Sequence, residues 1–366
     1  MRIISGSKTE PKNKNQIRFI REDSVSPDWA LAAGKHLFTS FQNSNVEVRP
    51  TLIISQINSP AIVIGQFQNS LKVLKDEAWD KYPVYRRITG GGAAFFNKGV
   101  VHIAFVVPDY QQFLGVSALK SIPKKLNNIL LSTLREEGLS LSLQTADVLT
   151  KKGFKVGGIG FECQNSVAFF ECWLGIEQSI DIPDNLYGYP KLSDDTYSWK
   201  SKSVAELVSD ESLIPAWDSE FAHKVSFNME SPELEVDEVE WKWLDKERIN
   251  GLRQKQWLQK ASETLDDKFS ISKLVEDYSG FIHAAVSVPD GNIIQKVKLF
   301  GDFQADADGI RELEEKLEWT SVKKRSIALI IDDVLVGSRN HIILGIKRLG
   351  SILEAIMDGV VKEKSK

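Results

Sequence analysis

The sequence predicts an α/β protein with two domains, and two observations support this expectation. The chain has 366 residues, well above the usual size of about 150 residues for one domain. Runs of β-branched residues alternate along it with stretches whose apolar residues recur at helical spacing. We expect a large domain over residues 1–240 and a smaller α+β domain over residues 241–366.

The composition is that of a globular protein and excludes several classes of function. Hydrophobic residues make up 42% of the chain and charged residues 26%, and the net charge is −4. This charge gives no general attraction to nucleic acid or to an anionic membrane. No apolar run approaches the ~18 residues of a spanning helix, and the polar first 26 residues do not resemble a secretory signal. With only two cysteines, which exclude a disulfide framework, we expect a cytoplasmic protein with no nucleic-acid or membrane partner.

The elements expected in the first half follow from apolar spacing and turn residues. A helix is predicted where Trp29, Leu31, Ala32 and Leu37 share one face. Glycines at 90–92 would form the bend of a hairpin-like element. In chain order we expect a strand at 16–22, the helix at 28–41, strands at 50–57 and 61–67, the hairpin-like element at 77–108, and an amphipathic helix at 116–138.

The elements expected in the second half are less regular. An acidic segment at 230–240 has the composition of a connector, and Asp290-Gly291 marks a turn between two strands. The predicted elements are strands at 145–162 and 166–182, a short helix at 204–208, a helix-rich piece beyond 240, strands at 280–289 and 292–303, a helix at 309–318 and a helical tail.

The stretch "YRRITGGGAAFFNKG" at 85–99 places two arginines beside three consecutive glycines. Glycine weakens a strand, and it is tolerated where the backbone passes close to another group. Guanidinium groups beside such a loop suit a bound carboxylate or phosphate, although a tight turn or bulge explains the glycines equally well. The loop lacks the Gly-Lys-Ser/Thr of an NTPase and the glycine spacing of a dinucleotide fold.

Five stretches, in order, resemble the lipoate–protein ligases and their relatives, the octanoyltransferases and biotin ligases. They are "DWALAAGKHLF" at 28–38, "AIVIGQFQNSLKV" at 61–73, "RRITGGGAAFFNKG" at 86–99, "ADVLTKKGFKVGGIG" at 146–160 and, more weakly, "SWKSKSVAEL" at 198–207. A sixth stretch, "VKLFGDFQADADGIRELEEKLE" at 297–318, is similar to the accessory domain of the two-domain ligases.

The resemblance implies a fold and a reaction. The fold is a mixed sheet flanked by helices, followed by an accessory domain that swings during the cycle. The reaction activates lipoate with ATP to lipoyl-AMP and passes the lipoyl group to a lysine of a carrier domain. ATP, Mg²⁺ and lipoate are therefore the expected cofactors and substrate, and a lipoyl-accepting protein is the expected partner.

The resemblance also implies roles for particular residues. Lys155 would lie at the reacting carboxylate and α-phosphate, although one more surface lysine is the alternative. Asp147 would hold Mg²⁺, with a turn or capping aspartate as its alternative. The remaining candidates would bind the acid and the adenylate: Arg86, Arg87, Gly90, Gly91, Gly92, Ala93, Val156, Gly157 and Gly158.

Several positions depart from the family pattern and leave the substrate open. Phe96 stands where His is usual, Val100 and Ala146 where Asn is usual, Gly157–Ile159 where Ser-Gly-Ser is usual, and Phe170–Cys172 where His-His-Gly is common. The main alternative is an octanoyl or lipoyl transferase that uses a thioester at Cys163 or Cys172. A lipoyl-binding relative without catalysis and biotin as the substrate are further alternatives. His102 and His283 lie in apolar strands and are expected in the core.

Overall fold

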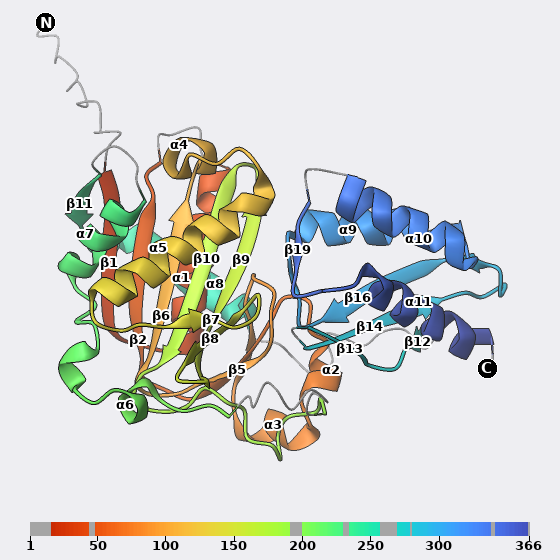
Figure 1. Ribbon diagram of the computed structural model, residues 1–366, viewed down its shortest axis with the longest axis horizontal. Coiled ribbons are helices and arrows are strands. Elements are labelled where there is room, and N and C mark those ends of the chain that lie inside the picture. Colours follow the sequence, from red (N-terminus) through yellow and green to blue (C-terminus); the bar gives the residue numbers. More distant parts are fainter. Residues whose placement is uncertain are drawn as a thin grey trace, which may run out of the picture.

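The protein is described by a computed structural model that covers residues 16–43, 48–190, 200–229, 234–256, 269–278, 280–337 and 341–364. Figure 1 shows a large sheet covered by helices on one side of the molecule and a smaller α+β unit on the other. Among the residues covered, none of the helices has the length and apolar character needed to cross a bilayer.

The large sheet has eight strands and is mixed, as the sequence predicts. β1 pairs in parallel with β11 and β2, whereas the remaining neighbours pair antiparallel. In sheet order the strands are β11 (Glu235–Glu238), β1 (Gln16–Val25), β2 (Thr51–Ile57), β6 (Val100–Val107), β10 (Val167–Gly175), β9 (Phe154–Gln164), β8 (Val148–Lys151) and β7 (Ser142–Leu143).

Helices cover both faces of this sheet because each has one apolar face to bury. On one face, α1 (Pro27–Gln42) packs with α8 (Trp243–Gln256). On the other face lie α5 (Ile122–Glu136) and α7 (Ser219–Asn228). The helix expected from residue 116 begins only at Ile122, with Pro123 in its first turn, where the missing N–H costs nothing. The short elements are α4 (Tyr110–Leu114), η1 (Leu119–Ser121), α6 (Val204–Leu207) and η2 (Glu211–Leu213).

A second, three-stranded sheet carries the glycine-rich stretch. Its order is β4 (Val84–Arg86), β3 (Ala61–Ile64) and β5 (Ala94–Phe96), with α2 (Ser70–Val73) and α3 (Asp76–Lys81) between β3 and β4. The expected hairpin is wrong, because β4 and β5 both pair with β3 and not with each other. The glycines therefore form a loop that crosses from one side of β3 to the other.

The smaller unit has its own hydrophobic core between a sheet and three helices. β14 (Gly280–Ser287) is central and pairs with β12 (Ser270–Ile271), β13 (Val275–Asp277) and β16 (Lys296–Gly301). α9 (Ala307–Leu317), α10 (Lys324–Asp332) and α11 (Leu349–Lys364) supply the helices. The other elements are β15 (Ile293–Ile294), β17 (Gln304–Ala305), β18 (Thr320–Ser321), the π-helical turn η4 (Asp333–Gly337) and β19 (Ile343–Leu344).

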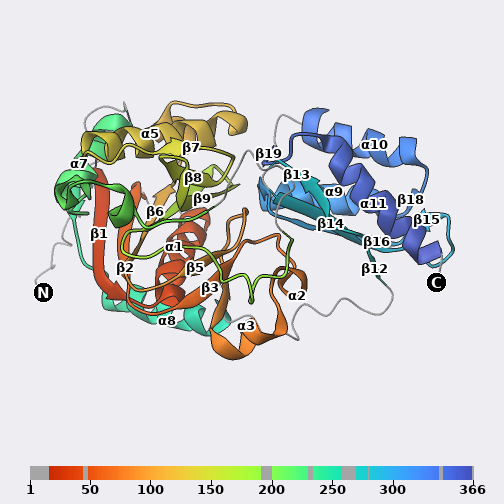
Figure 2. The same cartoon turned by 60° about the horizontal axis from the view of Figure 1, so that its bottom comes forward.

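The division between the two units was expected after residue 240. β11 lies in the acidic segment expected to be a connector, and α8 follows it. Trp241 and Ile249 are buried in the hydrophobic cluster that α1 forms on the large sheet. Figure 2 shows α8 beneath the large sheet, away from the smaller unit. We therefore propose that the large domain continues to residue 256 and that the accessory domain follows.

Candidate functional site

The glycine loop, defined as Gly90–Gly92, is fastened by Arg87. This side chain is 2% exposed. Its Nη2 donates hydrogen bonds to the carbonyls of Gly90 (2.6 Å) and Gly92 (2.9 Å), and its Nε donates to Thr89 Oγ1 at 3.1 Å. The structure thus gives Arg87 a bracing role in the loop, and only its Nη1 is left without a partner among the described atoms.

Arg86 braces a neighbouring loop. Its Nη1 donates to the carbonyls of Gly65 (2.8 Å), Gln66 (2.9 Å) and Gln68 (2.7 Å). These residues belong to the Ile-Gly-x-x-Gln-Asn stretch, so both arginines of the motif hold backbone in place. Their role in binding a carboxylate or phosphate stays a prediction.

Close contacts explain why Gly90 and Gly91 cannot carry side chains. A Cβ on Gly90 would collide with the Phe303 carbonyl and come within 2.8 Å of Gln304 Cα. Gly91 has φ +90°, a left-handed conformation that favours glycine, and its N–H donates to Phe303 O at 2.7 Å. The loop therefore makes room for a segment of the smaller unit.

Asp147 holds the other side of the loop. Its Oδ2 accepts a hydrogen bond from the Gly92 N–H at 2.9 Å, and its Oδ1 accepts one from Thr145 Oγ1 at 3.0 Å. Burial raises the pKa of Asp147, while these hydrogen bonds and the charges of Lys155 and Arg87 act in the opposite direction. The acid expected from the sequence thus does lie against the glycine loop.

A β-bulge determines which side of the sheet Lys155 faces. Thr150 pairs with Lys155 whereas Leu149 pairs with Gly157, so β9 carries one extra residue, Val156. Val156 and Ile159 both lie in the core cluster beneath α5, although an unbroken strand would place them on opposite faces. The bulge therefore turns the Lys155 side chain to the face of Gly158.

The ammonium group of Lys155 lies in a mostly acidic environment. Its Nζ is 3.4 Å from Asp181 Oδ1, and the side chain is 19% exposed. Its charge also lowers the pKa of two buried acids, Asp147 and Asp302, against the larger effect of burial. Lys155 and the glycine loop are thus connected electrostatically through Asp147. Val156 and Gly157, predicted to contact ligand, instead lie toward the core and the Trp173 carbonyl.

A buried polar network lies behind the loop, between the two sheets. Glu171 of β10 is 1% exposed; its Oε1 accepts a hydrogen bond from Thr89 Oγ1, and its Oε2 lies 2.9 Å from His102 Nε2. Arg87 Nε is 3.8 Å from Glu171 Oε1. Burial would raise the pKa of Glu171, but the His102 contact and the Arg87 charge lower it overall. His102 is in the core, as expected, and is paired with an acid there.

The glycines of β9, the glycine strand (Gly157–Gly160), also make room for protein groups. A Cβ on Gly158 would come within 2.6 Å of the Trp173 ring, and one on Gly160 within 2.7 Å of Thr89 Cβ. The Trp173 ring in turn lies under Arg87, whose Cζ is 4.5 Å from the ring centroid. Trp173 carries no motif, so sequence reasoning missed it.

The smaller unit contributes residues 301–304 to the site. Asp302 Oδ1 accepts a hydrogen bond from Gln68, Phe303 stacks on Phe67 at 5.0 Å, and Gln304 Nε2 donates to the carbonyls of Ala146 (3.0 Å) and Ile159 (3.1 Å). Burial raises the pKa of Asp302 to about 7. The Gln-Asn stretch gave a signal for Gln68, but only the general resemblance at 297–318 pointed to Asp302 and Phe303.

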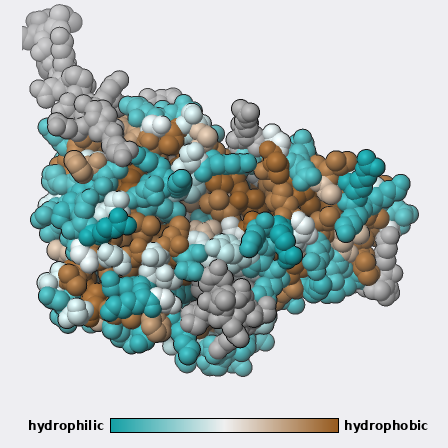
Figure 3. Space-filling model, viewed as in Figure 1, coloured by the Kyte–Doolittle hydropathy of each residue, from teal (hydrophilic) through white to brown (hydrophobic). Residues whose placement is uncertain are grey.

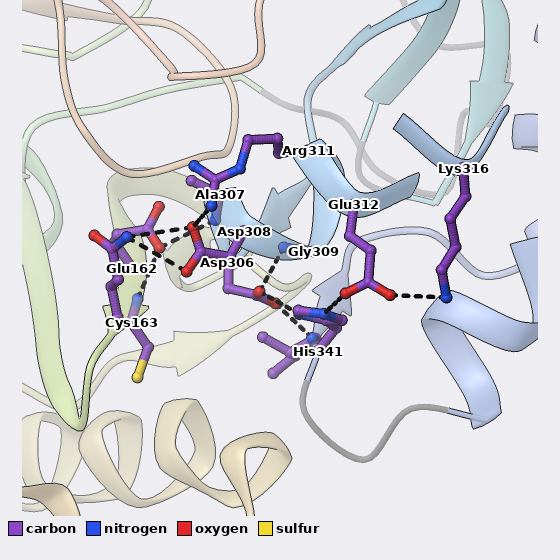
Figure 4. Close-up of polar contacts among 12 residues, drawn as sticks. Glu162, Cys163, Asp306, Ala307, Asp308, Gly309, Arg311, Glu312, Lys316 and His341 are labelled. Carbon is purple, nitrogen blue, oxygen red and sulfur yellow. Dashed lines mark hydrogen bonds and ion pairs between the residues drawn. The ribbon is translucent and has the colours of Figure 1, made fainter. Parts of the chain in front are cut away.

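A second contact between the units lies farther along β9 (Figure 4). Glu162 Oε1 accepts a hydrogen bond from the backbone N–H of Ala307, the first residue of α9, at 3.1 Å. It also accepts one from the N–H of its neighbour Cys163, at 2.9 Å. Burial raises the pKa of Glu162 well above its usual value. Hydrophobic residues also gather along the junction on the visible face in Figure 3, and Ile342 joins the same core cluster as Phe161. The smaller unit thus packs against β9 through α9 and β17.

The two cysteines are poorly suited to nucleophilic catalysis. Cys163 is 7% exposed and Cys172 is 0% exposed. Burial raises the pKa of both thiols, which disfavours the reactive thiolate. The thioester alternative therefore gains no support from the positions of these side chains.

The chain matches known proteins over most of its length. The model of the lipoyl protein ligase A/B catalytic domain matches residues 26–210. The lipoate-protein ligase LplJ of Bacillus subtilis is 23% identical over 300 residues, which cover 78% of this chain and 84% of that protein. Lipoate–protein ligase 1 of Staphylococcus aureus is 22% identical over 314 residues, which cover 82% and 89%.

Solved structures share the fold. The Plasmodium falciparum protein LipL1, in complex with lipoate, superposes with a TM-score of 0.63 at 18% identity and covers 88% of this chain and 96% of its own. A bipartite lipoate protein ligase of Thermoplasma acidophilum, studied with its E2 lipoyl domain, gives 0.52 at 15% identity and covers 68% and 94%. Because the family match spans half of the sequence, the chain belongs to the lipoyl protein ligase A/B catalytic domain family.

Proposed function

We propose that this protein is an ATP-dependent lipoate–protein ligase. It activates lipoate to lipoyl-AMP and transfers the lipoyl group to a lysine of a carrier domain. Family membership and the relatives named lipoate–protein ligases support the reaction. The observation that carries the proposal is the bulge at Val156, which turns Lys155 to the face of β9 where Asp147 meets the glycine loop.

Lys155 is the proposed catalytic residue. Adenylate formation develops negative charge on the reacting carboxylate and the α-phosphate, and a fixed cation stabilises that charge. Acids offset the Lys155 charge from several sides, Asp181 most directly at 3.4 Å. Binding of an anionic substrate would let the flexible lysine stem exchange this partner for the reacting group.

The proposed ATP site includes Mg²⁺, which would neutralise the phosphate charge. Asp147 fits this ion only as a single ligand, because each of its oxygens already accepts one hydrogen bond. The described residues contain no group of three acidic, His or Cys side chains arranged to hold a metal. The phosphate oxygens and water would therefore supply most of the coordination.

The partner is a lipoyl carrier domain, and the protein acts in the cytoplasm. The Thermoplasma neighbour was studied together with a lipoyl domain, which supports this class of partner. Both cysteines are free, which suits a reducing compartment.

The decisive experiment incubates the full chain with lipoate, Mg-ATP and a lipoyl-accepting domain, and measures the intact mass of the acceptor. We expect an added lipoyl group that requires ATP and is lost in Lys155→Ala. Lys151→Ala is the matched control, because Lys151 lies on the same hairpin and its Nζ donates to the backbone carbonyl of Ser140, at 3.3 Å. It should retain activity.

Three outcomes would contradict the proposal. Lipoylation that proceeds unchanged in Lys155→Ala would show that Lys155 is not the catalytic residue. Acyl transfer that needs no ATP and is abolished in Cys163→Ala or Cys172→Ala would replace the ligase by a thioester transferase. Tight lipoate binding without release of pyrophosphate would indicate a lipoate-binding protein that lacks ligase activity.

A further inference from the structure

Within the described part of the chain, two buried hydrogen-bond donors beside the glycine loop have no acceptor. Arg87 commits Nε and Nη2 to the protein, but its Nη1 has no partner among the described atoms, and neither does Trp173 Nε1. The two side chains are 2% and 3% exposed. A buried donor without a partner loses its hydration and gains nothing in return, so a site with two of them needs an explanation.

The two donors belong to one small region. The Arg87 guanidinium stacks on the Trp173 ring, with Cζ 4.5 Å from the ring centroid. Trp173 pairs directly with Gly158 across the β9–β10 ladder, and a Cβ on Gly158 would come within 2.8 Å of Trp173 Nε1. The indole thus packs directly against the Gly158 backbone, where no side chain would fit.

This region lies on the same face of β9 as the proposed catalytic lysine. Lys155 and Gly158 are three residues apart, or about 10 Å along a strand. The bulge at Val156 gives both positions the same orientation. A lysine side chain and a small acid can bridge such a distance.

We propose that Trp173 is a substrate-binding residue, whose Nε1 and the Nη1 of Arg87 together donate hydrogen bonds to one oxygen of the acyl group. The oxygen belongs to the free carboxylate before activation and to the acyl carbonyl in the adenylate. The assignment rests on the proposed function, since it takes lipoate as the acid. The proposed hydrogen bonds give Arg87 a second role beyond bracing the loop. They also give Trp173 a role that no sequence motif predicts.

The test compares two tryptophans that differ in location. Trp173→Phe keeps an aromatic ring for Arg87 and Gly158 but removes the N–H. Trp241→Phe is the control, because Trp241 is also buried at 4%, also lacks a partner for Nε1, and also lies near an arginine, with Arg18 Cζ 6.0 Å from its ring. Trp241 belongs to the α1–α8 cluster, away from the glycine loop.

Binding of lipoate and of its alcohol analogue, which lacks the carboxylate, is measured by calorimetry without ATP. We expect Trp173→Phe to weaken lipoate binding about tenfold, as for one lost hydrogen bond to a charged group. Binding of the alcohol should change less than twofold, and Trp241→Phe should leave both unchanged. In the wild-type chain, one of the nine indole N–H signals should shift when lipoate is added.

The proposal is overturned if Trp173→Phe binds lipoate as tightly as the wild type, if both variants weaken it equally, or if no indole signal moves. A buried water would then satisfy the two donors. These results leave the proposed ligase activity intact provided that the wild type still lipoylates its acceptor. A wild type that neither binds lipoate nor modifies an acceptor contradicts both.

Discussion

The glycine loop and the glycine strand resemble each other in sequence but differ in what they accommodate. The loop at Gly90–Gly92 receives the Phe303 carbonyl from the smaller unit on one side and the Asp147 carboxylate on the other. The strand at Gly157–Gly160 receives Trp173 and Thr89, from the interior of the large domain. A glycine in the sequence thus indicates that another group approaches the backbone closely, but it does not identify that group.

The loop is held mainly by charges and hydrogen bonds, and the strand mainly by packing. Arg87 links the two, because it bonds to loop carbonyls and stacks on Trp173. If this comparison is right, substitutions in the two regions should change the stability of the protein by different amounts. They should also be detected by different measurements.

The largest expected effect comes from removing the charge that compensates Arg87. Glu171→Ala would leave the buried guanidinium without its nearest counter-ion, and breaking a buried pair in this way costs about 3–5 kcal/mol. Urea unfolding followed by circular dichroism measures the loss. Glu315→Ala, at an exposed position of α9, should stay within about 0.5 kcal/mol. A loss below about 1 kcal/mol for Glu171→Ala would mean that the network does not hold the loop.

The next effect tests packing at the strand. Gly158→Ala places a methyl group within 2.6 Å of the Trp173 ring, and such overpacking costs about 1–3 kcal/mol. Gly251→Ala in α8 is the control, since nothing lies within 4 Å of its added Cβ. That change should raise the free energy of unfolding by up to about 1 kcal/mol, through helix propensity. Equal responses at the two glycines would contradict the packing argument.

A smaller effect should separate two glycines of the loop. Gly90→Ala forces residues 303–304 of the smaller unit to move, at a cost of about 1–2 kcal/mol, whereas an added Cβ at Gly92 meets only Asp147 Oδ2 at 3.8 Å. Hydrogen exchange at the Gly91 amide, which bonds to Phe303, should quicken in Gly90→Ala. It should stay near the wild-type rate in Gly92→Ala, and a reversed order would disprove the assigned contact.

A different observable, the pH dependence of stability, tests the side of the smaller unit. Burial raises the pKa of Asp302 from 3.8 to about 7, so the folded protein binds a proton there that the unfolded chain has released. This contribution to stability is complete below pH 4 and is lost as the pH rises toward 7, with a slope of about 1.4 kcal/mol per pH unit at most. Asp302→Asn should flatten that part of the profile in unfolding experiments. Parallel profiles for variant and wild type would show that Asp302 is ionised throughout.

Much of the architecture followed from local patterns. Apolar spacing predicted α1, and turn residues such as Asp290-Gly291 separated neighbouring strands. The hairpin at the glycines was wrong because the sequence shows two strands and a turn but cannot show that β3 lies between them. The later start of α5 shows that a proline can decide where a long amphipathic pattern becomes helical.

The sequence by itself determined that glycines, arginines, an acid and a lysine recur in the order of a ligase family, since motif order is a property of the chain. Only the tertiary structure decided which of them meet. The bulge at Val156 arises from the register between β8 and β9, and it alone sets the face of Lys155. The contacts of Gly91 with Phe303 and of Arg87 with Trp173 join residues far apart in the chain. Such contacts follow from packing across the whole molecule, and packing leaves no local pattern to read.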